Sequence, residues 1–350
     1  MEVRLDPRLL TLSAALTAGG LPPAGQDEHP LVTDTRRRLA DHAAHPGVRR
    51  LCEAFAQHQL LGLAMHTVQL GPPPDFDDSC PDGVPPFVEA WFAAVDRTAL
   101  AEALRSVWRD LRVGALLQEQ APRWEEVVRD LSSRLADAQI EPFQRLFWGR
   151  FPYEVVLVPL WNMNGAGLRG VGVATVRETY AVCPAQGDQP PGQVDLLVWA
   201  QHEASHPVLD DIQRQHGQVP GECAFVERDC PPAGGFARHY GDPTSRWVET
   251  LIRTSTCFYL EYLGRPEDAE AFAESQVEAG VTAIPVFREA LRPWWEARRQ
   301  GTAPGLELVL PQLPAWLRSA LARRREADPA PGGPPGGSQD AGDPPPDMHA

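Results

Sequence analysis

Helical periodicity dominates this chain and gives way only once to strand-forming residues. The two strand-forming runs cover residues 153–160 and 172–182, and turn-forming residues at 162–167 separate them. β-Branched residues favour strands, and a tight polar connection favours an antiparallel hairpin. Apolar residues recur at helical spacing in 7–19, 34–66, 87–118, 122–147, 193–216, 243–263 and 266–299. The sequence therefore predicts an α+β fold with a small hairpin inside a mostly helical chain.

Proline and glycine divide the chain into regions, since 36 of its 350 residues are proline. Residues 1–150 are expected to form a helical N-terminal portion. Residues 151–300 are expected to form a second domain, which contains the candidate functional residues described below. A helical extension is expected at 301–327. Residues 328–350 are rich in Pro and Gly and have almost no apolar side chain to bury, so a disordered tail is predicted.

The formal net charge of -15 argues against a protein that binds the nucleic-acid backbone, because such binding needs a cationic surface. No run approaches the roughly 18 apolar residues of a transmembrane helix. The N-terminus lacks the basic region of a secretory signal. We therefore expect a cytoplasmic protein whose six cysteines are free thiols. The sequence predicts no oligomeric state.

The segment His202-Glu203-Ala204-Ser205-His206 forms an H-E-x-x-H motif. On a helix the two imidazoles lie four residues apart on one face, where both can bind one Zn²⁺. Glu203 can then act as general base and acid beside the metal. Alternatively, the two histidines are ordinary residues of an amphipathic helix. An apolar segment and a preceding strand at 172–182 favour the zinc site, and that strand could pair with an extended peptide.

Pro207 directly follows the motif and should disturb its helix. Proline lacks the N–H that a helix needs and clashes with the carbonyl four residues back. The helix is therefore expected to kink or stop at the motif. The two ligands can survive this change because only the turn from His202 to His206 must be helical.

A catalytic zinc needs a third protein ligand and one open position. Glu249 is the best candidate because it lies on a later amphipathic helix, as in gluzincins. His216, His239 and Asp210 are rival ligands, and Glu261 ranks below Glu249 on the same helix.

Two further residues are candidates for roles beside the metal. Arg253 lies four residues after Glu249 and could hold its carboxylate, bind a substrate carboxylate or form a surface ion pair. Tyr240 or its neighbour His239 could stabilise an oxyanion, although loop tyrosines are usually only packed.

Four segments together resemble a bacterial family of gluzincin-type metallopeptidases of unknown physiological function. These segments are Asp6-Pro7-Arg8-Leu9-Leu10, residues 42–48, the H-E-x-x-H motif and residues 249–253. Where relatives have Ser-Phe-x-Asn after the second histidine, this chain has Pro-Val-Leu-Asp at 207–210. The resemblance implies a zincin-like fold and a zinc peptidase.

The sequence thus predicts a zinc metallopeptidase that hydrolyses peptide bonds in a peptide or protein substrate. His202, His206 and Glu249 are its predicted metal ligands, and Glu203 and Tyr240 its predicted catalytic residues. The alternative is a catalytically inactive, zincin-like helical binding protein, because a fold does not fix a function.

Overall fold

The computed structural model describes residues 1–21, 29–78, 83–85, 88, 94–160, 171–184 and 192–327. Two predictions fall outside these residues, namely the turn at 162–167 and the disordered tail at 328–350. The described part is mostly helical and contains one small mixed sheet. The predicted α+β class is therefore confirmed.

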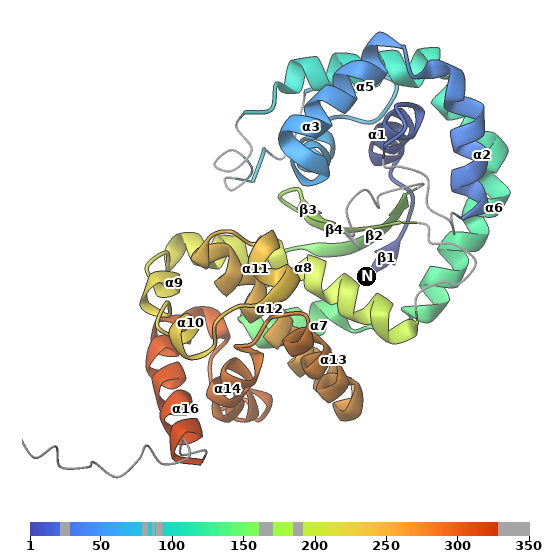
Figure 1. The fold of residues 1–350 in the computed structure, drawn as a ribbon. Helices are drawn as coiled ribbons and strands as arrows, with labels where there is room; N and C mark the ends of the chain where they lie inside the picture. Colours follow the sequence, from blue (N-terminus) through green and yellow to red (C-terminus); the bar gives the residue numbers. More distant parts are fainter. Residues whose placement is uncertain are drawn as a thin grey trace, which may run out of the picture.

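The sheet has four strands in the order β1–β2–β4–β3 (Figure 1). Their bounds are β1 (Glu2–Val3), β2 (Glu154–Leu160), β3 (Val171–Ala174) and β4 (Glu178–Pro184). The first three strands in this order run parallel, and β3 pairs antiparallel with β4. The predicted hairpin between 153–160 and 172–182 is wrong. The second run turns back on itself because the Thr175 hydroxyl accepts hydrogen bonds from the N–H groups of Arg177 and Glu178.

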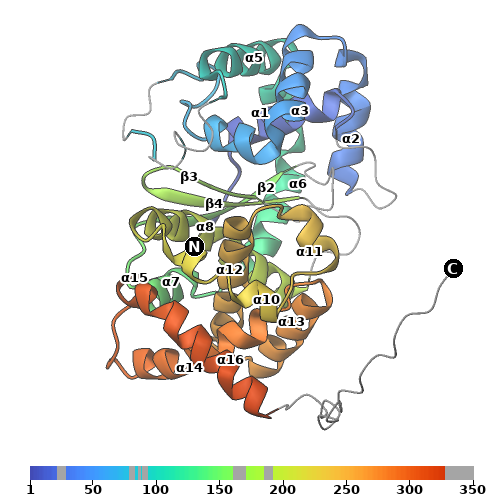
Figure 2. The same cartoon turned by 60° about the vertical axis from the view of Figure 1, so that its left-hand side comes forward.

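Helices cover both faces of this sheet (Figures 1 and 2). On one face α1 and α3 contact β2 and β3, and on the other face α7 and α8 contact the sheet. The helices before β2 are α1 (Pro7–Ala18), α2 (Pro30–Leu39), α3 (Pro46–Thr67), α5 (Arg97–Asp110), α6 (Val113–Arg134) and α7 (Ile140–Trp148). The later helices are α8 (Gln193–Gln215), α9 (Val219–Glu222), α10 (Val226–Asp229), α11 (Gly234–His239), α12 (Pro243–Tyr262), α13 (Pro266–Glu278), α14 (Ile284–Arg299), α15 (Leu306–Val309) and α16 (Leu313–Ala327).

Before residue 150, three of the predicted helical regions are divided differently in the structure. The region 34–66 breaks before Pro46, since a residue that precedes proline avoids helical geometry. Within the described residues, the regions 87–118 and 122–147 form α5, α6 and α7, with breaks at Arg112 and Gln139, both in the left-handed conformation. Residue 87 and residues 89–93 of the first region lie outside the described residues. Pro122, expected at the start of a helix, lies inside α6.

The later helical predictions agree more closely with the structure. The predicted helices 193–216 and 243–263 match α8 and α12. The region 266–299 is two helices, because Gly280 at φ 102° ends α13 in a conformation that favours glycine. The expected extension at 301–327 is helical and packs through α16 on α14.

One hydrophobic core runs through the sheet and joins the helices on both faces. Leu10 of α1, Leu157 of β2, Leu197 of α8 and Leu317 of α16 all belong to it. Residues 1–150 therefore share this core with the residues that follow them. Beneath α12 the rings of Phe147, Phe258 and Trp295 lie 5.6–6.0 Å from one another and hold α7, α12 and α14 together.

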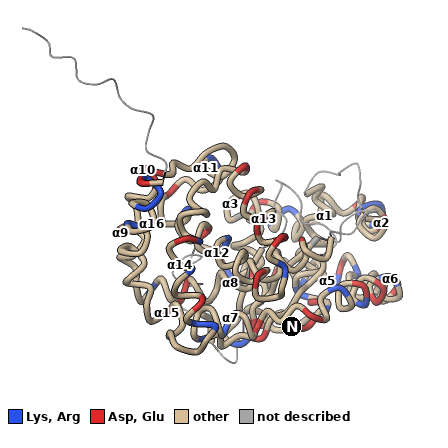
Figure 3. The backbone as a smooth tube through the Cα atoms, turned by 90° about the horizontal axis from the view of Figure 1, so that it is seen from below, with Lys and Arg blue, Asp and Glu red and all other residues tan. Residues whose placement is uncertain are grey.

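Charged residues of both signs are interspersed along α5 and α6 (Figure 3). On α6, for example, Arg134 pairs with Asp130 at 2.8 Å. None of the described helices combines the length and the apolar character that crossing a membrane requires. The five cysteines in the described part are free thiols, as predicted.

Candidate metal centre

Helix α8 carries the H-E-x-x-H motif and continues past it to Gln215. The prediction that this helix could stop at Pro207 is wrong. The residues beyond it, Val208, Leu209 and Ile212, are buried in the core and hold the helix in place. Pro207 has no N–H, so the Glu203 carbonyl lacks the helical donor that would normally come from position 207.

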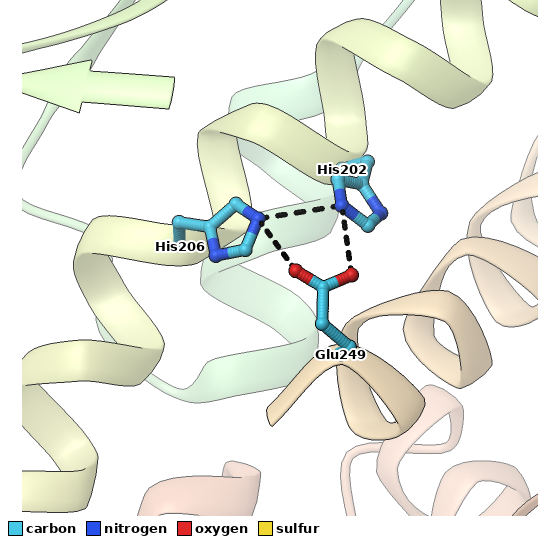
Figure 4. A group of neighbouring side chains, drawn as sticks. All are labelled: His202, His206 and Glu249. Carbon is cyan, nitrogen blue, oxygen red and sulfur yellow. Dashed lines mark hydrogen bonds and ion pairs between the residues drawn. The ribbon is translucent and has the colours of Figure 1, made fainter. Parts of the chain in front are cut away.

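Glu249 of α12 lies between the two imidazoles of α8 (Figure 4). Its Oε2 is 3.5 Å from Nε2 of His202, and its Oε1 is 3.6 Å from Nε2 of His206. The two Nε2 atoms are 3.3 Å apart. The structure thus brings together all three residues that were predicted as metal ligands.

These distances can be compared with those of a zinc site. Zinc binds histidine nitrogen and carboxylate oxygen at about 2.0–2.2 Å in tetrahedral sites, which places neighbouring ligand atoms roughly 3.3–3.6 Å apart. The three measured separations fall at this spacing. Two imidazoles and one carboxylate also leave a fourth position open, as catalytic zinc sites do. The residues present therefore fit a zinc ion.

The protonation states of the three side chains suit a cation. Burial lowers the pKa of His202 to about 3 and also lowers the pKa of His206, so both imidazoles are neutral at pH 7. Burial opposes the charge of Glu249, but the two imidazoles in their protonated form and the guanidinium of Arg253 hold the pKa of Glu249 below its usual value. Neutral imidazoles and an ionised carboxylate are the forms that bind metal.

Glu203 lies beside this group without being part of it. Its Oε2 is 4.0 Å from Nε2 of His206. Burial, followed by the charge of Glu249, raises the pKa of Glu203 to about 8, while Arg253, the Gly172 N–H and the Trp199 indole act in the opposite direction. A cation nearby would favour the charged form of this carboxyl group. Glu203 is thus a titratable group at the edge of the site.

Arg253 holds the outer side of Glu249. Its Nη2 donates to Glu249 Oε2 at 3.1 Å, and its Nη1 donates to Gln276 of α13. Of the three roles considered for Arg253, the structure therefore agrees with the first, in which Arg253 holds the Glu249 carboxylate.

Tyr240 caps the C-terminal end of α11, and burial together with the charge of Glu249 raises the pKa of its hydroxyl. Glu203 also raises the pKa of that hydroxyl and Arg253 lowers it, so Tyr240 lies within reach of the charges of the predicted site.

The rival ligands lie outside the group. Among the described residues, the cluster that could hold an ion contains neither His216, His239, Asp210 nor Glu261. Glu261 instead pairs with Arg292 and Arg288 of α14. Asp210 is buried, and its Oδ1 lacks a hydrogen-bond partner.

A buried polar network lies behind the motif and was not predicted from the sequence. The Gln201 amide donates to Ser205 and Ser255, each at 3.0 Å, and accepts from Thr256 at 2.5 Å. Gln144 of α7 donates to Ser205 at 2.9 Å. These side chains are fully buried and link α8 to α12 and α7, so they fix where Glu249 meets the imidazoles. The spacing of Gln201 and Ser205 on one helix face was the only signal in the sequence.

Gln201→Leu should lower the free energy of unfolding by about 1–3 kcal/mol, because buried partners of the amide lose their hydrogen bonds. Urea unfolding followed by circular dichroism measures this change. Gln215→Leu, at the exposed end of the same helix, is the matched control. Equal effects of the two substitutions would show that the network does not stabilise the helix pair.

Comparison with known proteins finds no matching family model, no matching curated protein and no matching solved structure. The resemblance to gluzincin-type peptidases, drawn from four short segments, therefore stays a prediction.

Proposed function

We propose that the protein is a zinc-dependent metallopeptidase of the H-E-x-x-H gluzincin type that hydrolyses peptide bonds. The observation that carries this proposal is the triangle of His202, His206 and Glu249 donor atoms at the spacing of tetrahedral zinc ligands. The position of Glu203 beside the triangle, outside the ligand group, supports hydrolysis rather than a purely structural metal site. The zincin-like assignment of the fold belongs to the same proposal.

The proposed roles follow from the chemistry of each group. Zn²⁺ supplies a Lewis acid that polarises a carbonyl and lowers the pKa of a water towards about 7. Glu203 accepts a proton from the attacking water and delivers it to the leaving amine. Arg253 keeps Glu249 ionised and fixes the orientation of its carboxylate.

Tyr240 is the proposed donor to the oxyanion that forms when water adds to the carbonyl. Burial keeps its hydroxyl protonated, because it raises the pKa above the usual value for tyrosine. A neutral O–H can donate a hydrogen bond to developing negative charge, and donors placed in this way stabilise the transition state.

Zinc content and chelator sensitivity test this proposal. After purification with Zn²⁺, elemental analysis should give about one zinc per chain, because the site has one set of three ligands. Cleavage of a mixed peptide library should stop on addition of 1,10-phenanthroline and return when Zn²⁺ is added back. Zinc near zero would contradict the metal site. Bound zinc without cleavage would favour the inactive binding protein.

A further inference from the structure

The register of β3 determines which of its backbone groups face away from the sheet. The Thr175 N–H donates to the Glu178 carbonyl at 2.9 Å, and opposite residues of an antiparallel pair alternate between bonded and non-bonded pairs. Val173 therefore bonds to Tyr180 of β4. Gly172 and Ala174 direct their N–H and carbonyl groups outward.

At Ala174 these outward groups are occupied by α3. The Gln69 side chain donates to the Ala174 carbonyl at 2.7 Å, and the Ala174 N–H lies 3.5 Å from the sulfur of Met65. The edge of the sheet is therefore closed to a peptide strand at Ala174. The strand at 172–182 was expected to be able to pair with an extended peptide, and Ala174 cannot take part in such pairing. Gly172 is the next outward-facing residue along β3.

Gly172 lies directly against the turn of α8 that carries Glu203. A Cβ atom placed on Gly172 would lie 2.5 Å from the Glu203 carbonyl oxygen and 3.1 Å from its Oε2. Real Cβ atoms essentially never come within 3.0 Å of a heavy atom outside their own and the adjacent residues, so no other residue fits here without a shift of the strand. The carbonyl at this contact is the one that Pro207 leaves without a helical donor.

We propose that Gly172 is a positioning residue for Glu203. Its missing side chain lets β3 approach α8 closely. The outward N–H of Gly172 can then reach the Glu203 carboxylate and hold it beside the metal ligands. Pro207 contributes by leaving the Glu203 carbonyl free to face the strand. The consequence for catalysis rests on the proposed function, whereas the contact itself does not.

Amide exchange tests the contact without any assay of activity. The exchange rate of the Gly172 amide, resolved by NMR, should rise about tenfold in Glu203→Ala, which removes the acceptor. Glu203→Gln keeps a side-chain oxygen and should exchange as the wild type does. Equal rates in all three proteins would overturn the proposal, whether or not the protein proves to be a peptidase.

Gly172→Ala tests the consequence for turnover. Displacement of β3 should lower kcat roughly 10–100-fold with little change in KM, because misplacing a catalytic group costs about this much. Zinc content should stay at the wild-type level, since all three ligands lie on α8 and α12. Gly221→Ala is the matched control because an added Cβ meets nothing within 4 Å.

Wild-type kcat in Gly172→Ala would overturn the positioning role, and so would a loss of zinc that accounts for the whole loss of activity. If the proposed function is wrong, the outcome is different, because the wild-type protein itself then cleaves no peptide. In that case the exchange experiment still decides whether Gly172 holds Glu203, and it does so also if Gly172→Ala fails to fold.

Discussion

Glu203→Gln should lower peptide turnover by about 10²–10⁴-fold, the usual contribution of a general acid–base group, while the protein keeps its zinc. The substitution preserves the size of the side chain and a hydrogen-bond acceptor but removes the group that takes up the proton. Glu203 lies outside the ligand group, so metal binding should not depend on it. Steady-state kinetics and elemental analysis of the same preparation measure both quantities.

Glu274→Gln provides the matched control for this experiment. Glu274 is an exposed residue of α13, and its substitution should change neither turnover nor zinc content. If Glu203→Gln lost zinc together with activity, Glu203 would be a ligand and its assignment as acid–base group would be wrong. Full activity in this variant would exclude Glu203 from the chemistry altogether.

Glu249→Ala should weaken zinc binding by more than the roughly 10–100-fold typical of a residue that only supports a ligand. Its carboxylate spans both imidazoles, so its loss leaves two nitrogen donors and no negative charge between them. Competition with a chromophoric chelator measures the zinc dissociation constant. Turnover at limiting zinc should fall in parallel.

Asp210→Asn is the matched control for the third ligand, because Asp210 is the rival carboxylate on α8. It lies one helical turn beyond His206, is buried, and is not part of the ligand group. The substitution keeps the volume of the side chain, and zinc affinity should stay within a few-fold of the wild-type value. If Asp210→Asn released zinc and Glu249→Ala did not, the gluzincin assignment would fail.

Elements whose ends are marked by local chemistry were predicted well. Helix α12 begins where Asp242 caps the Ser245 N–H and Pro243 occupies the first turn, and both residues can be recognised in the sequence. The prediction wrongly placed a helix boundary near Pro122, where a proline typically begins or ends a helix, but Pro122 lies inside α6. Its packing overrides that preference, as it also does at Pro207 in α8.

The sheet could not be predicted from local patterns. The two strand-forming runs are adjacent in sequence, which favours a hairpin, yet β2 pairs in parallel with β4 and β1 joins from the start of the chain. Parallel pairing depends on contacts between residues far apart in sequence. The residues within each run therefore do not indicate which other strand will pair with it.

The sequence by itself determined the relation between His202 and His206, because helix geometry places residues four apart on one face whatever surrounds them. The sequence also indicated Glu249 as the third ligand, because the site needs one and because of the resemblance. It did not show that Glu249 lies close to the two histidines. Only the tertiary structure decided that Glu249 meets the imidazoles, that Arg253 and the Gln201 network hold it there, and that Gly172 lies against Glu203. The physical reason is that these contacts join separate elements, whose relative positions are set by the packing of one shared core.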